Sequence, residues 1–171
     1  SWEKVTTPTR SRWLQLAERP GGREQALLSA AILSALDRTV PASVLERCGE
    51  YERIAFALRA PGGLDSLTGG SEQAIGVCVE ALEQVRAEAR QGSYGFGGLD
   101  IAELTVAVAE ATGSTDLWEG LRDFLLDRHI SKDQKSRGLD RLVASAEAVP
   151  LSVVNSLRLG WTEILSSAEG G

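Results

Sequence analysis

Few side chains in this sequence could carry out chemistry, and none of them stands in a motif that defines an enzyme class. His129 is the single histidine, and it follows Asp127 and Arg128 near the end of an apolar periodic segment. Because the dipole of a helix favours a cation near its carboxyl end, we expect a structural role for His129. No GxSxG nucleophile motif accompanies it. We therefore expect no enzyme activity and no catalytic residue.

The two cysteines, Cys48 and Cys78, are not spaced as CxxC. Two thiols and one histidine supply too few soft ligands for a zinc site. We interpret both cysteines as buried free thiols of a reducing compartment, and not as a disulfide. The sequence thus predicts no metal and no cofactor.

The segment Gly92–Gly98 reads GSYGFGG, which invites comparison with a phosphate-binding loop. It lacks the Lys-Ser/Thr pair of a P-loop, and no predicted strand precedes it. A flexible connector is the simpler interpretation, but a connector does not need Tyr94 and Phe96. These aromatic residues either tuck back onto the core, which we favour, or form an exposed anchor for a partner.

The net charge is −6, which opposes binding to nucleic acid because that affinity depends on Lys and Arg at phosphates. Acidic residues dominate positions 100–130, and basic residues dominate positions 131–141. These regions either neutralise each other, or the acidic helices form a face for a basic partner. A smaller basic region lies near the N-terminus and consists of Arg10, Arg12, Arg19 and Arg23.

Apolar residues recur at helical spacing through most of the chain, and no segment alternates as a strand does. The pattern predicts an all-α fold with helices over 23–38, 71–90, 99–111, 116–130, 135–148 and 150–166. Each helix needs a buried apolar stripe. The last two stripes are predicted to consist of Leu139, Leu142, Val143 and Ala146, and of Val154, Leu157, Trp161, Ile164 and Leu165.

Local signals indicate where helices begin and end. Pro8, Pro41 and Pro150 are each expected to begin a helix, where the missing N–H costs nothing. Gly113 with Ser114 predicts a helix end followed by a new N-cap. Ser43 with Glu46 and Ser131 with Gln134 have the spacing of a capping box, although Pro41 competes with Ser43 for its cap.

One pentapeptide occurs twice, as VPASV at Val40–Val44 and as VPLSV at Val149–Val153. The same shift along the chain also superimposes Leu33 on Leu142. A repeat of about 36 residues would account for this, since periods of that size are typical of stacked helical pairs. Candidate intermediate turns at 68–70 and 112–114 are unevenly spaced.

Two segments carry a resemblance to a known repeat class. SRGLDRLVASAEAVPLSVVNSLRLGWTEILSS at Ser136–Ser167, and the shorter ALLSAAILSALDRTVPASVLERC at Ala26–Cys48, resemble HEAT-type helical hairpins with a Pro at the start of the second helix. The resemblance implies a right-handed superhelical array of antiparallel helical hairpins in one domain, 1–171, that is irregular between residues 58 and 98. It also implies an α-solenoid scaffold whose second helices line a concave face for proteins or peptides.

On this basis we expect a non-catalytic interaction module that binds a protein, a peptide or another domain of its parent chain. The expected contact residues on the second helices are Glu46, Arg47, Glu119, Arg122, Asn155 and Arg158, and Tyr94 and Phe96 are added from the glycine-rich loop. No nucleic-acid or membrane partner is expected. Because Met is absent, even at position 1, we expect a piece of a larger protein. The bias to Arg, Ala and Gly suggests a bacterial protein, and we expect it to be cytoplasmic.

Two alternatives remain at this point. The first is a regulatory or dimerisation domain that packs against a catalytic neighbour in the same chain. It predicts a large exposed apolar patch, in which we expect Trp2 and the N-terminal helix to take part. The second is a metal-dependent helical enzyme, which would need several carboxylates converging in one pocket.

Overall fold

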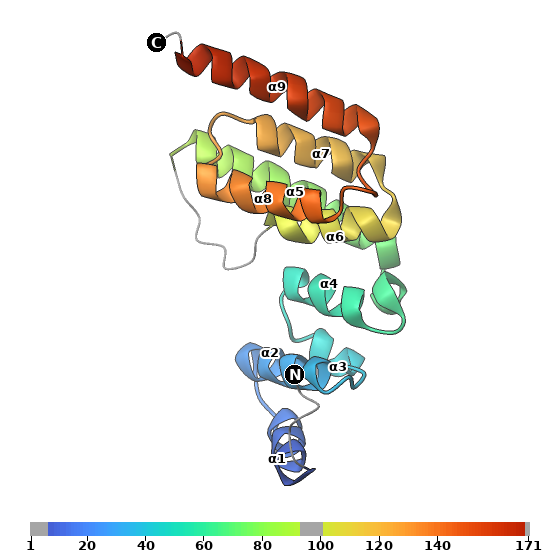
Figure 1. The fold of residues 1–171 in the computed structure, drawn as a ribbon. Helices are drawn as coiled ribbons and strands as arrows, with labels where there is room; N and C mark the ends of the chain where they lie inside the picture. Colours follow the sequence, from blue (N-terminus) through green and yellow to red (C-terminus); the bar gives the residue numbers. More distant parts are fainter. Residues whose placement is uncertain (1–6, 93–100, 170–171) are drawn as a thin grey trace. The chain divides into compact units, whose positions relative to one another are not determined.

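The computed structural model describes residues 7–92 and 101–169, and within these residues the chain forms helices and no strand. The all-α fold predicted from apolar periodicity is therefore confirmed (Figure 1). The elements follow in the order α1 (Thr7–Ala17), α2 (Arg23–Ala35), α3 (Ala42–Leu45), α4 (Glu50–Arg59), the 3-10 helix η2 (Gly63–Ser66), α5 (Gly70–Arg90), α6 (Ile101–Thr112), α7 (Thr115–Leu126), α8 (Lys132–Ala144) and α9 (Leu151–Glu169).

The chain divides into two compact units, Ser1–Ser71 and Glu72–Gly171. Helices α1 to α4 and η2 form the first unit, whereas α6 to α9 and nearly all of α5 form the second. The prediction that 1–171 form one domain stays a prediction. Among the residues that the structure describes, no helix has the length and hydropathy needed to cross a membrane. The predicted cytoplasmic location also stays a prediction.

Two of the predicted helix caps are confirmed. Ser114 is the N-cap of α7 and accepts a hydrogen bond from the backbone N–H of Leu117, and Ser131 caps α8 by accepting from Gln134. Gly113 has a φ of 67°, which ends α6 in the left-handed region that glycine adopts without strain. These short-range signals fix the turns on both sides of α7.

Between the two competing signals at the start of α3, the N-cap is Pro41 and not Ser43. Pro41 is extended, with a ψ of 145°, and its carbonyl accepts from the N–H groups of Val44 and Leu45. Ser43 lies inside the helix, and its own carbonyl accepts from the Nε of Arg47. Of the two competing signals the proline determines where α3 begins.

The repeated pentapeptide forms the same local turn in both places. The carbonyl of Pro150 accepts from the N–H of Val153, as that of Pro41 does from Val44. Val44, Val149 and Val153 are buried, and Val40 packs against the core of the first unit. Each copy therefore starts a helix and anchors it with a valine on either side of the proline.

The core of the first unit is built around α2, which packs against α1, α3 and α4. Ala26 and Ala30 are fully buried beside Val44 and Cys48. Small side chains on α2 let the short α3 approach closely. Leu27, Val40 and Phe56 cover this cluster at its edges.

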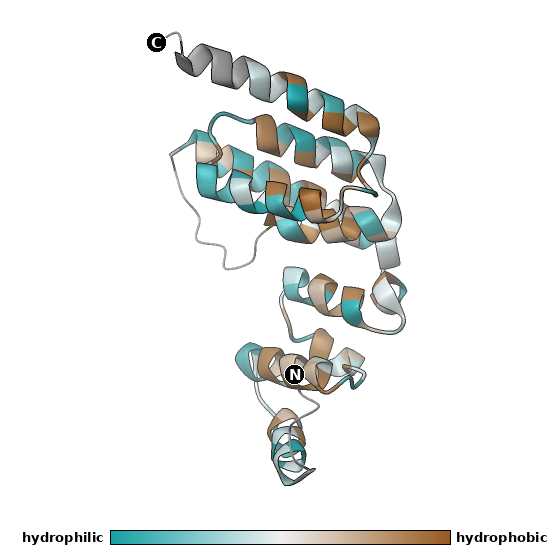
Figure 2. Cartoon of the chain, in the orientation of Figure 1, coloured by the Kyte–Doolittle hydropathy of each residue, from teal (hydrophilic) through white to brown (hydrophobic). Residues whose placement is uncertain are grey.

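The core of the second unit is built around α6 and α7, which pack against each other and concentrate hydrophobic residues (Figure 2). Helix α8 packs mainly on α6 and also touches α7, whereas α9 packs on α7. The fully buried side chains include Val106 and Val108 of α6 and Leu117, Leu121 and Leu125 of α7. Burying such a side chain stabilises the folded state by roughly 1.5–3 kcal/mol relative to leaving it exposed.

Two glycines set how closely the outer helices approach this pair. A Cβ at Gly138 of α8 would lie 3.1 Å from the Cβ of Ala102 and 3.1 Å from Cδ2 of Leu125. A Cβ at Gly160 of α9 would lie 2.6 Å from Cδ2 of Leu126. The contact at Gly138 is the stricter one, because the Cβ of Ala102 is fixed to its backbone.

We predict that Gly138→Ala lowers the free energy of unfolding by about 1 kcal/mol, because overpacking outweighs the better helix propensity of alanine. Gly76→Ala is the matched control, since Gly76 lies inside α5 and a Cβ there meets no atom within 4 Å. This control should raise the same free energy by about 0.5–1 kcal/mol. Urea unfolding of both variants measures the difference, and equal shifts would contradict the close approach at Gly138.

Candidate functional site

The residues predicted from the sequence to contact a partner are spread over both units. Glu46 and Arg47 are exposed and directly follow α3, which ends at Leu45 in the first unit. Arg47 donates to the carbonyls of Ser43 and, at 2.6 Å, of Gly21, so it ties α3 to the turn before α2. The remaining described candidates lie in the second unit, and Tyr94 and Phe96 lie outside the described residues.

In the second unit the candidates occupy two helices. Glu119 of α7 is exposed, whereas Arg122 is half-buried and donates to the adjacent Asp123 at 2.9 Å. Asn155 and Arg158 are exposed on α9. The exposure of these side chains does not show whether they bind a partner, so their role in binding stays a prediction.

Glu119 lines a shallow hollow of about 290 Å³ between α5 and α7. Four carboxylates surround it, and Arg86 is the one base among its lining residues. Leu82 and Val79 contribute apolar walls beside Gly120. Three of the carboxylates lie in the acidic region, 100–130, that the sequence analysis identified. Glu83 of α5 lies outside that region, and the sequence could not reveal it because no local pattern indicates that α5 and α7 lie together. The four are Glu83, Asp116, Glu119 and Asp123.

The chemistry open to this hollow is limited. Within the described residues no group of three or more His, Cys, Asp or Glu side chains is placed to hold a metal ion. The metal-dependent enzyme therefore gains no support from these carboxylates. What they offer is a negatively charged surface along α5 and α7.

Asp127 is the most strongly bound charged group, and it lies just after α7 with a side chain that is 4% exposed. Its Oδ2 accepts from the Nε of Arg86 at 3.0 Å and from Arg90 at 3.1 Å, both on α5. Its Oδ1 accepts from the backbone N–H of His129 and lies 3.0 Å from Nδ1 of the same residue. The carboxylate thus joins the end of α5 to the turn between α7 and α8.

These contacts also control its protonation. Burial alone would raise the pKa of Asp127, but the hydrogen bonds from the backbone of His129, from Arg86 and Arg90 and from the His129 ring outweigh it and hold the pKa well below its ordinary value. His129 therefore has a structural role of a different kind from the predicted one. Its partner is a buried carboxylate and not the dipole of α7, which ends at Leu126.

Both cysteines are buried and neither forms a disulfide. Burial raises the pKa of Cys78 to about 11, and it also raises the pKa of Cys48. A thiol with a raised pKa is a weak nucleophile at neutral pH. Their predicted interpretation as buried free thiols fits this arrangement.

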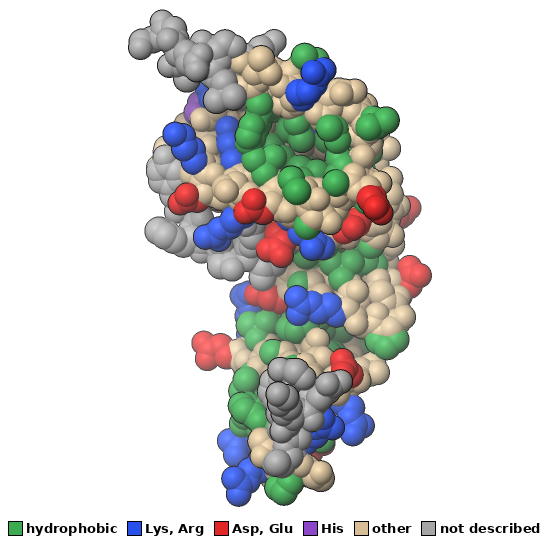
Figure 3. Space-filling view, in the orientation of Figure 1, with side chains coloured by type: hydrophobic (Ala, Val, Ile, Leu, Met, Phe, Trp, Pro, Cys, Tyr) green, Lys and Arg blue, Asp and Glu red, His purple; other side chains and the backbone are tan. Residues whose placement is uncertain are grey.

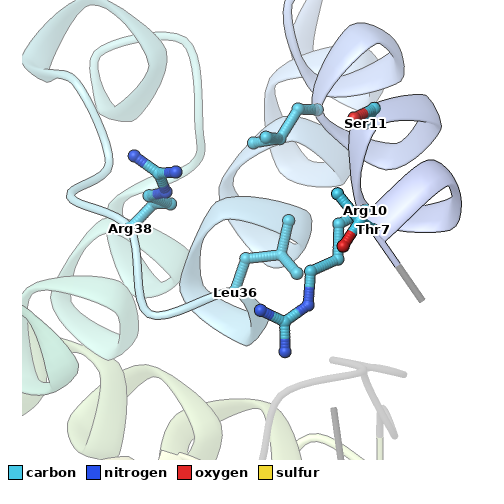
Figure 4. A pocket seen from close by; sticks show the side chains of 6 residues that line it. Thr7, Arg10, Ser11, Leu36 and Arg38 are labelled. Carbon is cyan, nitrogen blue, oxygen red and sulfur yellow. The ribbon is translucent and has the colours of Figure 1, made fainter. Parts of the chain in front are cut away.

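A second hollow, of about 240 Å³, lies between α1 and the end of α2 in the first unit (Figure 4). Arg10 and Arg38 lie at its rim, with Leu36 between them, and their guanidinium groups point in different directions. Two bases that do not converge do not form an anion site. Of the predicted basic region, Arg23 pairs with Glu52 at 3.0 Å and holds α2 to α4.

The largest departure from the sequence-based expectation is on α8 and α9. Val143, predicted to be buried in the stripe of α8, is 75% exposed, and Val154, predicted in the stripe of α9, is 44% exposed. Ala146 is exposed as well, and Trp161 is only half-buried. Periodicity identified these stripes correctly as apolar, but the two helices bury only part of each one.

The exposed parts of the two stripes lie on helices that both pack on α7. Helical spacing places Leu139 and Val143 on the edge of α8 opposite to the edge that holds Glu110 of α6 through Arg141 and Ser145. Figure 3 shows hydrophobic side chains gathered over the region between α8 and α9. We call this surface the α8–α9 face, and it consists of Leu139, Val143, Val154, Leu157 and Trp161.

Comparison with known proteins finds no relative of this chain. No protein family, curated protein or solved structure matches the chain.

We predict that Asp127→Asn lowers the free energy of unfolding at pH 7 by about 2 kcal/mol, because Arg86 and Arg90 lose the charge that they share. Asp123→Asn is the control, since that carboxylate is 46% exposed and, among the described residues, forms an ion pair with its neighbour Arg122 alone. It should cost less than about 1 kcal/mol. Urea unfolding of both variants provides the comparison, and equal costs would contradict the role of Asp127.

The same contacts predict a dependence on pH. Because the pKa of Asp127 is lowered in the folded state, its stabilisation is complete above the ordinary Asp value of about 4 and declines as the pH falls below it. Asp127→Asn should lack this part of the acid destabilisation. Unfolding free energies measured between pH 7 and pH 2.5 would show parallel curves for the two proteins if this account were wrong.

Proposed function

We propose that this chain is a non-catalytic helical module that binds a protein or peptide segment, and that it does so within a larger protein. The observation that carries the proposal is the α8–α9 face, where Val143 and Val154 are apolar, periodic and exposed. Contiguous apolar side chains that face water are unfavourable in an isolated monomer and are typical of interaction sites. Leu151 and Leu159, 79% and 60% exposed, extend the apolar character of α9 beyond this face.

A HEAT-like superhelix is part of the same proposal. The shared turn at Pro41 and Pro150 supports it, since both copies begin a helix in the same way and bury the valine three residues after the proline. An exposed apolar edge on the last described hairpin also fits a repeat array, in which each pair buries its apolar face against a neighbour. The difference in length between α3 and α9 argues for a strongly irregular array.

A second candidate is favoured by the same face. A regulatory or dimerisation domain that packs against a neighbouring domain also requires an exposed apolar surface. The sequence led us to expect that surface at Trp2, which lies outside the described residues, and at the N-terminal helix. The described apolar surface is instead on α8 and α9, so a neighbouring domain would have to dock there.

The test is a selection of helix-forming peptides from a phage-displayed library against the immobilised chain. We expect the enriched peptides to bind at least about tenfold more weakly to Val143→Asp than to the unaltered chain, since a charge in an apolar contact is costly. The matched control is Ala144→Asp, which adds the same charge one residue further along α8, away from Leu139.

No enrichment, or equal binding to both variants, would contradict an interaction site on this face. Analytical ultracentrifugation separates the two candidates. Self-association that depends on concentration and is abolished by Val143→Asp would favour a dimerisation domain, whereas a monomer that binds peptides would favour the module.

A further inference from the structure

The α8–α9 face has the dimensions and spacing of a site for a helix. Val154, Leu157 and Trp161 occupy positions i, i+3 and i+7 on one edge of α9, a rise of about 10 Å or two helical turns. Leu139 and Val143 stand at i and i+4 on the edge of α8 that borders the same region. Two apolar rows of this length match the i, i+3, i+4 and i+7 anchors of an amphipathic helix.

The reason that this face is uncovered lies in the packing of the two helices. The inner face of α9 packs on α7, and that of α8 packs on α6 and α7. Gly160 brings α9 onto Leu126, and Gly138 brings α8 onto Ala102 and Leu125. No described element covers the hydrophobic side chains that Figure 3 shows between α8 and α9.

Charge at the border of the face indicates the chemistry of the occupant. Arg158 lies one turn from both Val154 and Trp161, and it is the single charged side chain among residues 151–162 of α9. On α8, Lys132 falls on the same edge as Leu139, two turns before it. These two side chains are positively charged, whereas the whole chain has a net charge of −6. Asp133 and Asp140 of α8 project from its outer face, beside Arg137.

We propose that the α8–α9 face binds an acidic amphipathic helix, with its apolar stripe against the face and carboxylates directed at Arg158 and Lys132. The inference rests on the proposed function and names the partner class of that site. A basic helix would meet Arg158 and Lys132 as like charges at the border of the face.

The experiment uses two synthetic helical peptides with the same leucine stripe, one with Glu and one with Lys on both flanks. Fluorescence anisotropy measures their binding to the 171-residue chain at low and at physiological salt. We expect the Glu peptide to bind about tenfold or more tightly than the Lys peptide at low salt, with a smaller difference at physiological salt.

Variants test whether the border cations cause this preference. The double variant Lys132→Glu, Arg158→Glu should reverse it, whereas Arg137→Glu, on the outer face of α8, should leave the order of the peptides unchanged. A preference that survives the double variant, or a Lys peptide that binds more tightly to the unaltered chain, would overturn the acidic assignment.

Failure of this inference can be distinguished from failure of the proposed function. If both peptides bind equally and Val143→Asp abolishes both, the face is an interaction site but its partner is not acidic. If neither peptide binds and the library yields none, both proposals are wrong. Self-association through the face would assign it to a second copy and would also overturn the acidic partner.

Discussion

The approach of α8 and α9 to the α6–α7 pair is the constraint on which the second unit depends. Because Gly138 has no side chain, α8 can lie against Ala102 and Leu125 at the same time. Gly160 allows α9 to lie on Leu126 in a similar way. The inner faces of both helices are thereby buried in one core, whereas Val143 of α8 and Val154 of α9 stay exposed.

A polar cluster around Asp127 holds the turn between α7 and α8 in place. Asp127 accepts hydrogen bonds from α5 through Arg86 and Arg90 and from the turn before α8 through His129. A buried carboxylate costs free energy unless such donors surround it. The cluster therefore fixes where the α7–α8 turn lies relative to α5, and the N-cap at Ser131 sets where α8 begins. Glycine contacts and this cluster together determine the exposure of the α8–α9 face.

Local sequence signals predicted much of this fold. The helix that begins after Ser131, the cap at Ser114 and the glycine end at Gly113 all depend on interactions within four residues, so the sequence displays them directly. Apolar periodicity likewise identified α2, α5, α6, α7, α8 and α9, although it did not single out α4. Ser43 shows the limit of such signals, since two local rules competed and the proline prevailed.

Features that depend on distant residues could not be predicted. Arg86 and Arg90 precede Asp127 by 41 and 37 residues, with α6 and α7 in between, and nothing in the sequence around Asp127 indicates that they meet. Periodicity likewise marks Val143 as apolar but cannot say which element would cover it, and so it was predicted to be buried. The candidate site lies where the local rule and the tertiary packing disagree, as is common for functional surfaces.

The central claim is that the α8–α9 face is open to solvent in the free chain, and hydroxyl-radical footprinting with mass spectrometry tests it most directly. Val153 and Val154 form an internal pair of the same residue type, 3% and 44% exposed. The account predicts that Val154 is oxidised much faster than Val153, and that Val143 is oxidised much faster than the buried Leu142 relative to their intrinsic reactivities. Equal protection within both pairs would mean that the face is already covered in solution, and would contradict the account.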